Sequence, residues 1–309
     1  MKVLSLFDGM ACGMIAMNLA GVDVESYDAY EIDKYAVKTA QHNFPMIREH
    51  GDVFAADFTQ YEGVDFMVGG SPCTYWSIAQ TKNRETVASG MGWELFSQYV
   101  RALHEAKPKY FIYENNKSMS KEIRASIDKT FGFEAVLINS ALVSAQNRQR
   151  LYWVGKRNAD GTYSKVNVEQ PDDKGILLRD ILETGIAWQE KSYNLTTRCN
   201  GAIPSDTLKR HRHTMVAEPV CVAELGSKTH PVYEVRNGLI TIKGKQHPIK
   251  LKDGNYIIRK LTVRECMRLQ TVPETYEFPV SNSQAYKMLG NGWTCEVIAH
   301  LIRSALMED

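Results

Sequence analysis

Cys73 is the residue whose sequence neighbours most clearly indicate a catalytic role. It lies in GGSPCTYW, directly after the apolar run VDFMV, and therefore in a loop that follows a predicted strand. Open α/β sheets place their ligands at the carboxyl ends of parallel strands. Pro72 fixes its own backbone angle φ, and Gly69 and Gly70 permit a sharp turn, so the thiol is held in place. Two interpretations of Cys73 stay open at this point, a nucleophilic thiol and a buried unreactive cysteine.

A carboxyl group and two arginines follow at other strand ends. Glu114 ends the apolar run YFIY. Because parallel strands end at one edge of a sheet, we expect it to face the same cleft as Cys73. A carboxyl group beside a thiol can polarise a substrate by donating a proton. Arg148 and Arg150 in QNRQR are two residues apart and are predicted to share one face, where they can hold carbonyl or phosphate oxygens. A plain surface pair is the alternative for these arginines.

Three short sequence motifs near the N-terminus are typical of a binding site for a nucleotide-like ligand. FDGMACG ends a predicted strand and opens a helix, so Gly9 and Gly13 allow backbone amides to approach a ligand, although the string is not GxGxxG. Glu31 in YEID lies where a ribose hydroxyl is bound in Rossmann-type sites, and Asp52 in HGDV is expected near an adenine amino group. Turn glycines and solvated or capping carboxylates are the alternatives.

The first half of the chain contains the elements that must position these residues. Short apolar runs alternate with helical patterns from KVLSLFD to EAVLINSALV, which predicts a mainly parallel sheet covered on both faces. Gly21 and Gly132 follow the last periodic residues of two helices, where caps are expected. The predicted fold class is a doubly wound α/β sheet with a second, smaller and irregular β-rich domain.

From about Lys156 the pattern changes to short β-prone pieces between Asn-Gly and Asp-Gly turns. Helical signals return where Thr262 and Glu265 form a capping box, and a final amphipathic helix, WTCEVIAHLIRSALM, is expected to pack on the first domain. We therefore predict a catalytic and cofactor-binding domain at 1–156, a recognition domain at 157–258 and a returning C-terminal segment at 259–309.

Composition excludes several classes of protein. The 309 residues are 44% apolar and 24% charged, which is ordinary for a globular chain. Six widely spaced cysteines without a CxxC pair argue against a zinc ribbon and against a secreted disulfide framework. The N-terminal apolar run is too short for a signal peptide, and no run approaches the roughly 18 apolar residues of a membrane span. These features predict a reduced, cytoplasmic protein without a metal site or a membrane.

Charge is distributed unevenly, although the formal net charge is only +1. Residues 191–260 hold 13 Lys and Arg against 5 Asp and Glu, a local charge of +8 that leaves −7 elsewhere. Such an asymmetry is typical of a nucleic-acid-facing module on an acidic enzyme body, because phosphate neutralisation supplies most of the sequence-independent affinity. A solvated basic face is the alternative.

Taken together and in this order, the strings resemble those of the cytosine-5 DNA methyltransferases. The set comprises FDGMACG, YEID, GDV, GGSPC, YEN, QNRQR, a variable segment, RKLTVRECMRLQ and YKMLGNG, and it spans nearly the whole chain. The chain looks like a compact prokaryotic or phage-type enzyme, and SPC and GNGWT also resemble the animal de novo branch.

The resemblance implies specific roles for the catalytic candidates. Cys73 would add to carbon 6 of cytosine, which makes carbon 5 nucleophilic. Glu114 would hold or protonate ring N3. Arg150 and Arg148 would contact the base carbonyl or its phosphate, and Asn115 would anchor the loop.

The same resemblance implies S-adenosylmethionine as the methyl donor and S-adenosylhomocysteine as the product. Family analogy assigns the cofactor site to Phe7, Asp8, Gly9, Gly13, Glu31, Ile32, Asp52, Val53, Pro72, Leu95, Asn291 and Trp293. The first four are expected around the methionine part, the next two at the ribose and adenine, and Asp52 with Val53 at the adenine edge. Asn291 and Trp293 would close the pocket.

Double-stranded DNA is the implied partner, and its target cytosine must be flipped out of the helix to be reached. The polar stretch after Cys73 is expected to close over DNA, with Lys82 and Arg84 as contacts and Gly90 and Gly92 as hinges. The segment 157–258 would be the target recognition domain, and its candidate DNA contacts are Arg198, Lys209, Arg210, Arg212 and Arg236. The resemblance also implies a monomer on DNA and a nucleoid-associated place in a bacterial or phage-infected cell, and it leaves open whether a restriction endonuclease accompanies the enzyme.

The sequence departs from the family pattern at four places. Thr74, Asn116 and Gly292 replace the usual Gln, Val and Ser, and Ile32 stands where a larger apolar or aromatic residue often stacks on adenine. Three other functions stay open: a tRNA methyltransferase of the same fold, whose Cys-Phe-Thr signature is lacking here, a catalytically silent DNA-binding relative, and a nicotinamide-dependent dehydrogenase.

Overall fold

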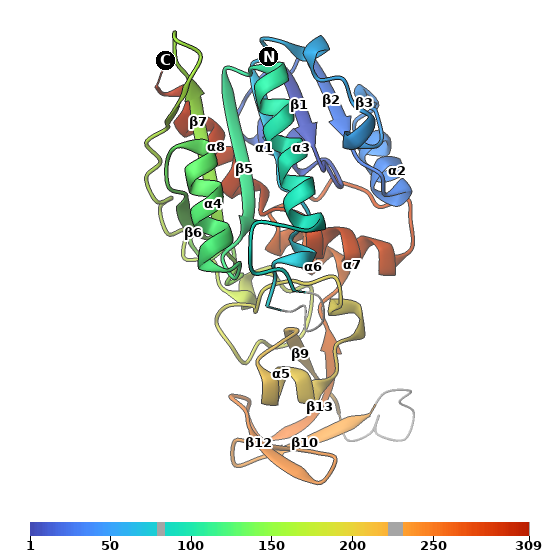
Figure 1. Cartoon of the computed structure of the whole chain (residues 1–309). Helices are drawn as coiled ribbons and strands as arrows, with labels where there is room; N and C mark the ends of the chain where they lie inside the picture. Colours follow the sequence, from blue (N-terminus) through green and yellow to red (C-terminus); the bar gives the residue numbers. More distant parts are fainter. Residues whose placement is uncertain (79–83, 222–230, 309) are drawn as a thin grey trace. The chain divides into compact units, whose positions relative to one another are not determined.

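The structure is a computed structural model that describes residues 1–78, 84–221 and 231–308 (Figure 1). The chain divides into two compact units. Unit 1 comprises Met1–Asn139, Gln149–Pro171 and Cys295–Asp309, and unit 2 comprises Ser140–Arg148 and Asp172–Thr294. No helix among the described residues is long and apolar enough to cross a membrane.

The bounds of these units differ from the three ranges predicted from the sequence. Residues 157–171 belong to unit 1, where β8 (Tyr163–Lys165) pairs with β7 (Gln149–Arg157). Residues 140–148 belong to unit 2, where the Ser144 hydroxyl donates a hydrogen bond of 2.6 Å to the carbonyl of Leu269. Of the C-terminal segment, only 295–309 return to unit 1.

Unit 1 is built on one mixed sheet with the strand order β3-β2-β1-β4-β5-β7-β6. Its remaining strands are β1 (Lys2–Leu6), β2 (Ser26–Tyr30), β3 (Ile47–Glu49), β4 (Phe66–Gly69), β5 (Tyr110–Asn116) and β6 (Val136–Asn139). The five strands from β3 to β5 are parallel, and β7 runs antiparallel to both of its neighbours in that order. The doubly wound, mainly parallel sheet predicted from the sequence is confirmed.

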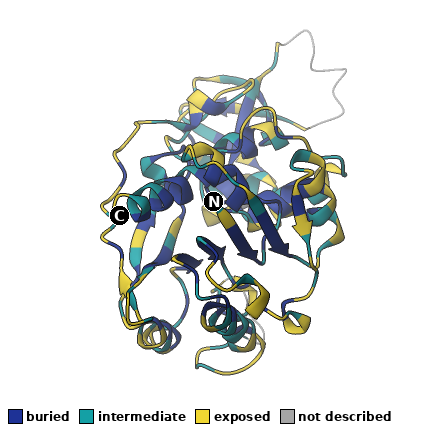
Figure 2. Cartoon of the chain, turned by 90° about the horizontal axis from the view of Figure 1, so that it is seen from above, coloured by how far each residue is buried: buried dark blue, intermediate teal, exposed yellow. Residues whose placement is uncertain are grey.

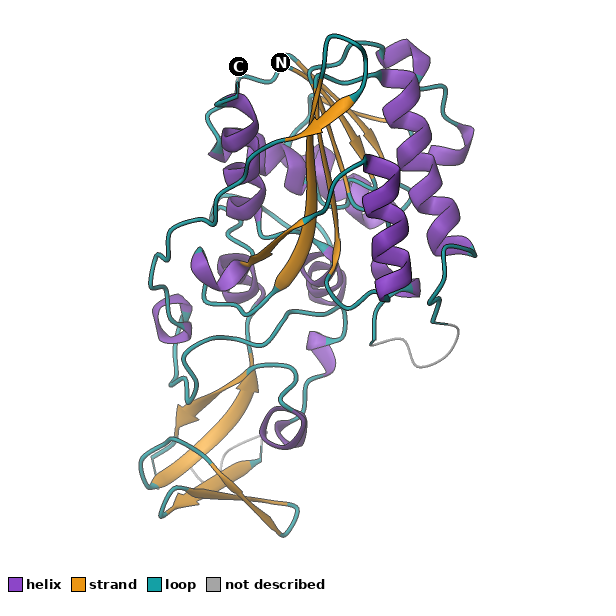
Figure 3. Ribbon diagram, turned by 60° about the vertical axis from the view of Figure 1, so that its left-hand side comes forward, coloured by secondary structure: helices purple, strands orange, loops and turns teal. Residues whose placement is uncertain are grey.

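Helices cover both faces of this sheet (Figure 3). They are α1 (Cys12–Leu19), α2 (Lys34–Asn43), α3 (Met91–Ala106), α4 (Lys121–Phe131) and α8 (Cys295–Leu306). Gly132 caps α4 in the left-handed conformation, as its place after the helical pattern predicts. The predicted packing of the last helix on the first domain is confirmed, since α8 packs on α1.

The core of unit 1 under α3 and α4 is strongly aromatic. Phe96, Tyr99, Phe111 and Phe131 are buried against one another with ring centroids 5.0–6.5 Å apart. Figure 2 shows the strands as the buried interior of this unit and the outer helix surfaces as exposed. The buried apolar area and the edge-to-face contacts stabilise the strand ends that carry the site.

Unit 2 contains a five-stranded antiparallel sheet with the order β12-β11-β10-β13-β9. Its strands are β9 (Met215–Pro219), β10 (Val232–Arg236), β11 (Leu239–Ile242), β12 (Lys245–Pro248) and β13 (Gly254–Lys260). Asn237 and Gly238 both have positive φ and form the two-residue turn between β10 and β11, as the Asn-Gly pair predicts. The predicted β-rich second domain is confirmed.

Three α-helices complete the described part of unit 2: α5 (Pro204–Arg210), α6 (Val263–Leu269) and α7 (Asn282–Asn291). The predicted capping box is present, since the Thr262 hydroxyl accepts from the amide of Glu265 and the Glu265 carboxylate accepts from the amide of Thr262. This reciprocal pair fixes where α6 begins.

Candidate active site

Cys73 lies on an exposed turn directly after β4. It begins a short 3-10 helix, η3 (Cys73–Tyr75), and its carbonyl accepts hydrogen bonds from the amides of Trp76 and Ser77 at 3.1 and 3.0 Å. The residue is exposed, as the preceding Pro72 also is. The alternative of a buried cysteine is therefore excluded, and the thiol can meet a ligand from solvent.

Buried polar groups fix the loop that carries Cys73. The Ser71 and Tyr113 hydroxyls lie 2.7 Å apart, and the Asn115 amide donates to the Ser71 carbonyl at 3.2 Å and to the Tyr113 hydroxyl at 3.1 Å. The expectation that Asn115 anchors this loop is confirmed. Burial raises the pKa of Tyr113, although the hydrogen bonds with Ser71 and Asn115 partly offset this rise.

Glu114 pairs with Arg150 across two neighbouring antiparallel strands. Arg150 Nε lies 3.0 Å from Glu114 Oε1, and each side chain is 12% exposed. Glu114 is opposite Tyr152 in the β5–β7 register, and Gly69 is opposite Tyr113 in the β4–β5 register. Strand order therefore brings the Cys73 loop and the ion pair to one edge of the sheet, as the sequence predicts.

Arg148 has its hydrogen-bond partners inside unit 2. Its guanidinium donates to the side chain of Asn194 at 3.0 Å and to the carbonyls of Leu195 and Gly292 at 3.2 and 2.7 Å. The residue is 3% exposed. These contacts give Arg148 a structural role, and its contact with a base stays a prediction.

The segment after Cys73 is described only in part, and Lys82 lies outside the described residues. Arg84 donates to the carbonyls of Trp76 and Ser118 at 3.3 and 2.7 Å, so it joins the loop to the end of β5. Gly92 is buried within α3, and a Cβ there would lie 2.5 Å from Trp76 Nε1. Close packing accounts for a glycine at this position, and the hinge role of Gly90 and Gly92 stays a prediction.

The loop between β1 and α1 has an unusual backbone. Phe7, Gly9 and Ala11 all have φ near +60°, a conformation that costs energy for residues other than glycine. The Gly9 amide donates to Glu31 Oε2 at 2.9 Å, which ties this loop to the end of β2. A Cβ on Gly13 would lie 2.4 Å from the Tyr27 hydroxyl, so close packing of α1 on β2 requires a glycine at this position.

Other predicted cofactor residues lie along the same edge of unit 1. Glu31 Oε1 accepts from the amides of Ile32 and Asp33, both at 2.8 Å, and the Ile32 side chain is 77% exposed. Asp52 is exposed and caps η1 (Val53–Ala55), whose Val53 is buried. Asn291, which ends α7, and the buried Trp293 lie in unit 2, and Leu95 is half-buried on α3. The role of these three residues in binding the cofactor stays a prediction.

Two acidic groups at this edge lack full hydrogen bonding. Asp8 Oδ1 accepts from the Ser5 and Tyr27 hydroxyls at 2.5 and 2.7 Å, whereas Asp8 Oδ2 and both oxygens of Glu49 are buried without a partner among the described residues. Burial raises the pKa of Asp8 to about 6 and that of Glu49 to about 8. Glu49 was not among the residues predicted from the sequence, although the two-residue period of a strand places it on the same face as buried Ile47.

Unit 2 carries a basic cavity of about 520 Å³. It is lined by Thr197, Arg198, Asn200, Gly201, Arg210, Arg212 and His213. Three of the five predicted DNA contacts in this unit thus share one cavity, and none of its lining residues is acidic. His211 and His213, on either side of Arg212, have φ near +51°, so a strained turn presents this arginine.

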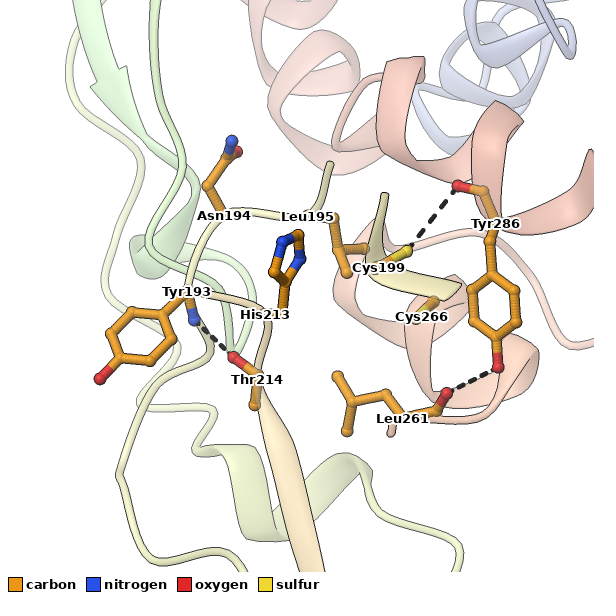
Figure 4. Close-up of a pocket in the computed structure, with 9 residues that line it drawn as sticks. All are labelled: Tyr193, Asn194, Leu195, Cys199, His213, Thr214, Leu261, Cys266 and Tyr286. Atoms are coloured by element: carbon orange, nitrogen blue, oxygen red, sulfur yellow. Dashed lines mark hydrogen bonds between the residues drawn. The ribbon is translucent and has the colours of Figure 1, made fainter. Parts of the chain in front are cut away.

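A second cavity in unit 2, of about 10 Å³, is shown in Figure 4. A volume of that size holds at most one water molecule. Cys199 and Cys266 line it, and Cys199 donates a hydrogen bond to the Tyr286 carbonyl (Figure 4). The neighbouring Cys266 thiol lowers the pKa of Cys199. The cavity is too small for a cofactor or a base, so we assign it to packing.

Comparison with known proteins decides the family. The family model for the C-5 cytosine-specific DNA methylases matches residues 1–306. The chain belongs to this family. The Type II methyltransferase M1.ScrFI of Lactococcus lactis subsp. cremoris is 28% identical, over 99% of this chain and 78% of that protein. The Type II methyltransferase M.HhaI of Haemophilus parahaemolyticus is 26% identical, over 97% of this chain and 93% of that protein.

A crystal structure of a Spodoptera frugiperda DNMT2 mutant shares the fold of this methylase, with a TM-score of 0.66, 18% identity and 99% coverage of both chains. Membership of the C-5 cytosine-specific DNA methylase family, matched over residues 1–306, makes the chain an enzyme that methylates cytosine in DNA, and enzymes of this kind use S-adenosylmethionine in general. Among the described residues there is no group of three His, Cys, Asp or Glu side chains able to hold a metal ion.

Proposed function

We propose that this methylase transfers a methyl group from S-adenosylmethionine to carbon 5 of a flipped-out cytosine in a specific duplex DNA sequence, through a covalent bond between Cys73 Sγ and carbon 6 of the base. After the transfer, loss of the proton on carbon 5 breaks the bond to sulfur and releases the thiolate. The observation that carries the proposal is an exposed thiol on a hydrogen-bonded loop at the same sheet edge as the Glu114–Arg150 ion pair. A nucleophile and an acid at one sheet edge are the groups that addition to a pyrimidine requires.

The residues at the ends of β1, β2 and β3 fit the cofactor. Partly unsatisfied acidic oxygens at Asp8 and Glu49 suit a cationic ligand, and the exposed Ile32 side chain suits an adenine ring. Phe7, Gly9, Glu31 and the other candidates of unit 1 would hold it. When bound, the cofactor supplies a methyl group activated by a sulfonium centre.

The other groups act on charge that develops in the base. Addition of the Cys73 sulfur to carbon 6 pushes electrons onto the ring, and Glu114 would deliver or share a proton at N3. Arg150 balances the Glu114 charge, and its remaining donors would contact the base carbonyl. Because both side chains are mostly buried, their electrostatic effect on the base is stronger than in water.

The basic cavity of unit 2 is our proposed DNA contact. Arg198, Arg210 and Arg212 would bind phosphates or base edges there, and exposed Lys209 adds charge nearby. Arg236 is also exposed, although it pairs with Glu234 at 2.8 Å. A restriction endonuclease as accompanying enzyme and a monomeric state on DNA remain predictions.

Transfer of a labelled methyl group tests the function directly. The purified chain is incubated with labelled S-adenosylmethionine and either duplex DNA or a tRNA transcript, and the modified DNA is sequenced after bisulfite treatment. We expect incorporation into DNA only, at cytosines within one recurring sequence. Transfer to tRNA alone would favour the tRNA methyltransferase, and no transfer with intact DNA binding would favour a silent relative.

A further inference from the structure

Glu49 occupies the end of a strand where two other acidic residues converge. In the parallel register, Glu49 of β3 is opposite Ala29 of β2, and Ala29 is opposite Ser5 of β1. Asp8 follows β1 by two residues and Glu31 directly follows β2. Three neighbouring parallel strands thus bring Asp8, Glu31 and Glu49 to one sheet edge.

The carboxyl group of Glu49 is buried without compensation. Both of its oxygens are shielded from solvent and accept no hydrogen bond from the described residues. Asp8 is 6% exposed, and its Oδ2 is likewise without a partner. An ionised carboxylate in such a place is costly unless a cation or a hydrogen-bond donor approaches it.

The charged groups around Glu49 do not supply that cation. The charges that act on it are those of Asp8 and Glu31, both acidic. Arg48 and His50, its neighbours in sequence, bind Asp28 at 2.5 and 2.7 Å instead. The other packed elements add no neutralising charge: α1 has no charged residue, and on α2 the side chains of Lys34, Lys38 and His42 are exposed.

We propose that Glu49 and Asp8 form an anionic receptor for the positive charge of the methyl donor, so that binding of the cationic cofactor, but not of its neutral product, expels a proton from this acidic group. The inference rests on the proposed use of S-adenosylmethionine. It assigns to Glu49 a role in discriminating substrate cofactor from product cofactor.

The two cofactors differ by one unit of positive charge. S-adenosylmethionine carries a sulfonium, an ammonium and a carboxylate, a net charge of +1, whereas S-adenosylhomocysteine lacks the sulfonium and is neutral. Without ligand, the raised pKa values of Asp8 (about 6) and Glu49 (about 8) mean that Glu49 holds a proton at pH 7. A bound cation favours the ionised carboxyl, so the proton passes to the buffer; it returns when the neutral product replaces the cation.

Calorimetry of ligand binding measures this proton. Each cofactor is titrated into the full chain at pH 7 in two buffers of different ionisation enthalpy, and the difference in heat gives the number of protons released. We expect roughly 0.5–1 proton for S-adenosylmethionine and close to none for S-adenosylhomocysteine. Equal release for the two cofactors would overturn the inference. An absence of any S-adenosylmethionine binding would instead refute the proposed function.

Two variants localise the effect. Glu49→Gln should abolish the release and weaken S-adenosylmethionine binding by about tenfold, while leaving S-adenosylhomocysteine binding unchanged. Glu122→Gln, an exposed glutamate on α4, is the matched control and should behave as the parent chain. Unchanged proton release in Glu49→Gln would contradict the assignment.

Stability of the ligand-free chain provides a readout that needs no cofactor. Because the pKa of Glu49 is raised by folding from 4.5 to about 8, this residue binds fewer protons in the unfolded chain, and its contribution to stability is expected to fall as pH rises from about 4.5 to about 8. Glu49→Gln should remove part of this fall in thermal unfolding at pH 6–9. A variant with the parent's full pH dependence would show that Glu49 is not the titrating group.

Discussion

Arg150 Nε and Glu114 Oε1 are 3.0 Å apart, and the two residues come from adjacent antiparallel strands. β7 therefore has two functions, since it completes the sheet and delivers a cation to the carboxyl group at its edge. The pair is formed without DNA, so the orientation of the acid is set before a base arrives. This preorganisation reduces the free energy needed to assemble the site around its substrate.

Replacement of Cys73 by Ser should reduce methyl transfer by at least about 10³-fold, because a hydroxyl is a far weaker nucleophile than a thiolate. Trapping on DNA that contains 5-fluorocytosine should also disappear, while cofactor affinity stays unchanged. Gel analysis of the covalent complex and calorimetry of cofactor binding measure these effects. Cys221→Ser, at another exposed cysteine, is the control and should remain active. Full activity in Cys73→Ser would refute the nucleophile.

Replacement of Glu114 by Gln should slow formation of the covalent adduct by about 10²–10⁴-fold, because the proton is needed as charge develops on the base. DNA affinity should change by much less. Rapid quenching on 5-fluorocytosine DNA and fluorescence anisotropy separate the two quantities. Equal losses in both would make Glu114 a structural residue.

Replacement of Arg198, Arg210 and Arg212 by Gln should weaken DNA binding and make it less dependent on salt. Each lost phosphate contact reduces the slope of log affinity against log salt concentration by about 0.9. Anisotropy at four salt concentrations measures this slope. Lys129→Gln on α4 is a control for the loss of an exposed charge. A slope that stays at the parent value in the triple variant would place the phosphate contacts elsewhere.

Glu265→Gln should lower the free energy of unfolding at pH 7 by about 2 kcal/mol, because Glu265 is buried and accepts charged hydrogen bonds from Arg259 at 2.8 and 2.9 Å. Burial raises its pKa, but the hydrogen bonds from Arg259 and from the amides of Thr262 and Glu183 lower it on balance.

The sign of the pH effect follows from that lowered pKa. The stabilisation is complete above the ordinary value of 4.5 and is lost as pH falls through the lower value of the folded state. Urea unfolding at pH 7 and pH 3 should therefore show a smaller difference between parent and variant at pH 3. Exposed Glu190 provides the control substitution. A difference that grows in acid would contradict this account.

The parts of the fold that depend on local sequence signals were predictable. Alternating strands and helices gave the sheet, Asn237-Gly238 predicted a hairpin, and Thr262 with Glu265 predicted the start of α6. The placement of Cys73 and Glu114 at one edge also followed, because strand ends converge in a parallel sheet. Local periodicity and turn chemistry are thus sufficient for these features.

Other features depend on contacts that the sequence does not display. The partners of Arg148 are distant in the chain, and β3 is too short for its period to be evident before its pairing with β2 is known. The left-handed Lys243-Gly244 turn between β11 and β12 lacks the usual Asn or Asp at its first position. In each case tertiary structure determines a conformation that local propensity leaves open.

The packing of α8 on α1 has a consequence for biosynthesis. Unit 1 is assembled from three separate stretches of chain, and a hydrogen bond joins Cys12 of α1 to Cys295, where α8 begins. During translation α1 is synthesised early, and more than 270 further residues are added before α8, which covers its apolar face, is synthesised. We therefore predict that the nascent unit 1 is aggregation-prone until its last helix arrives, and protection of Cys12 and Cys295, both buried, from alkylation would report when the unit has folded.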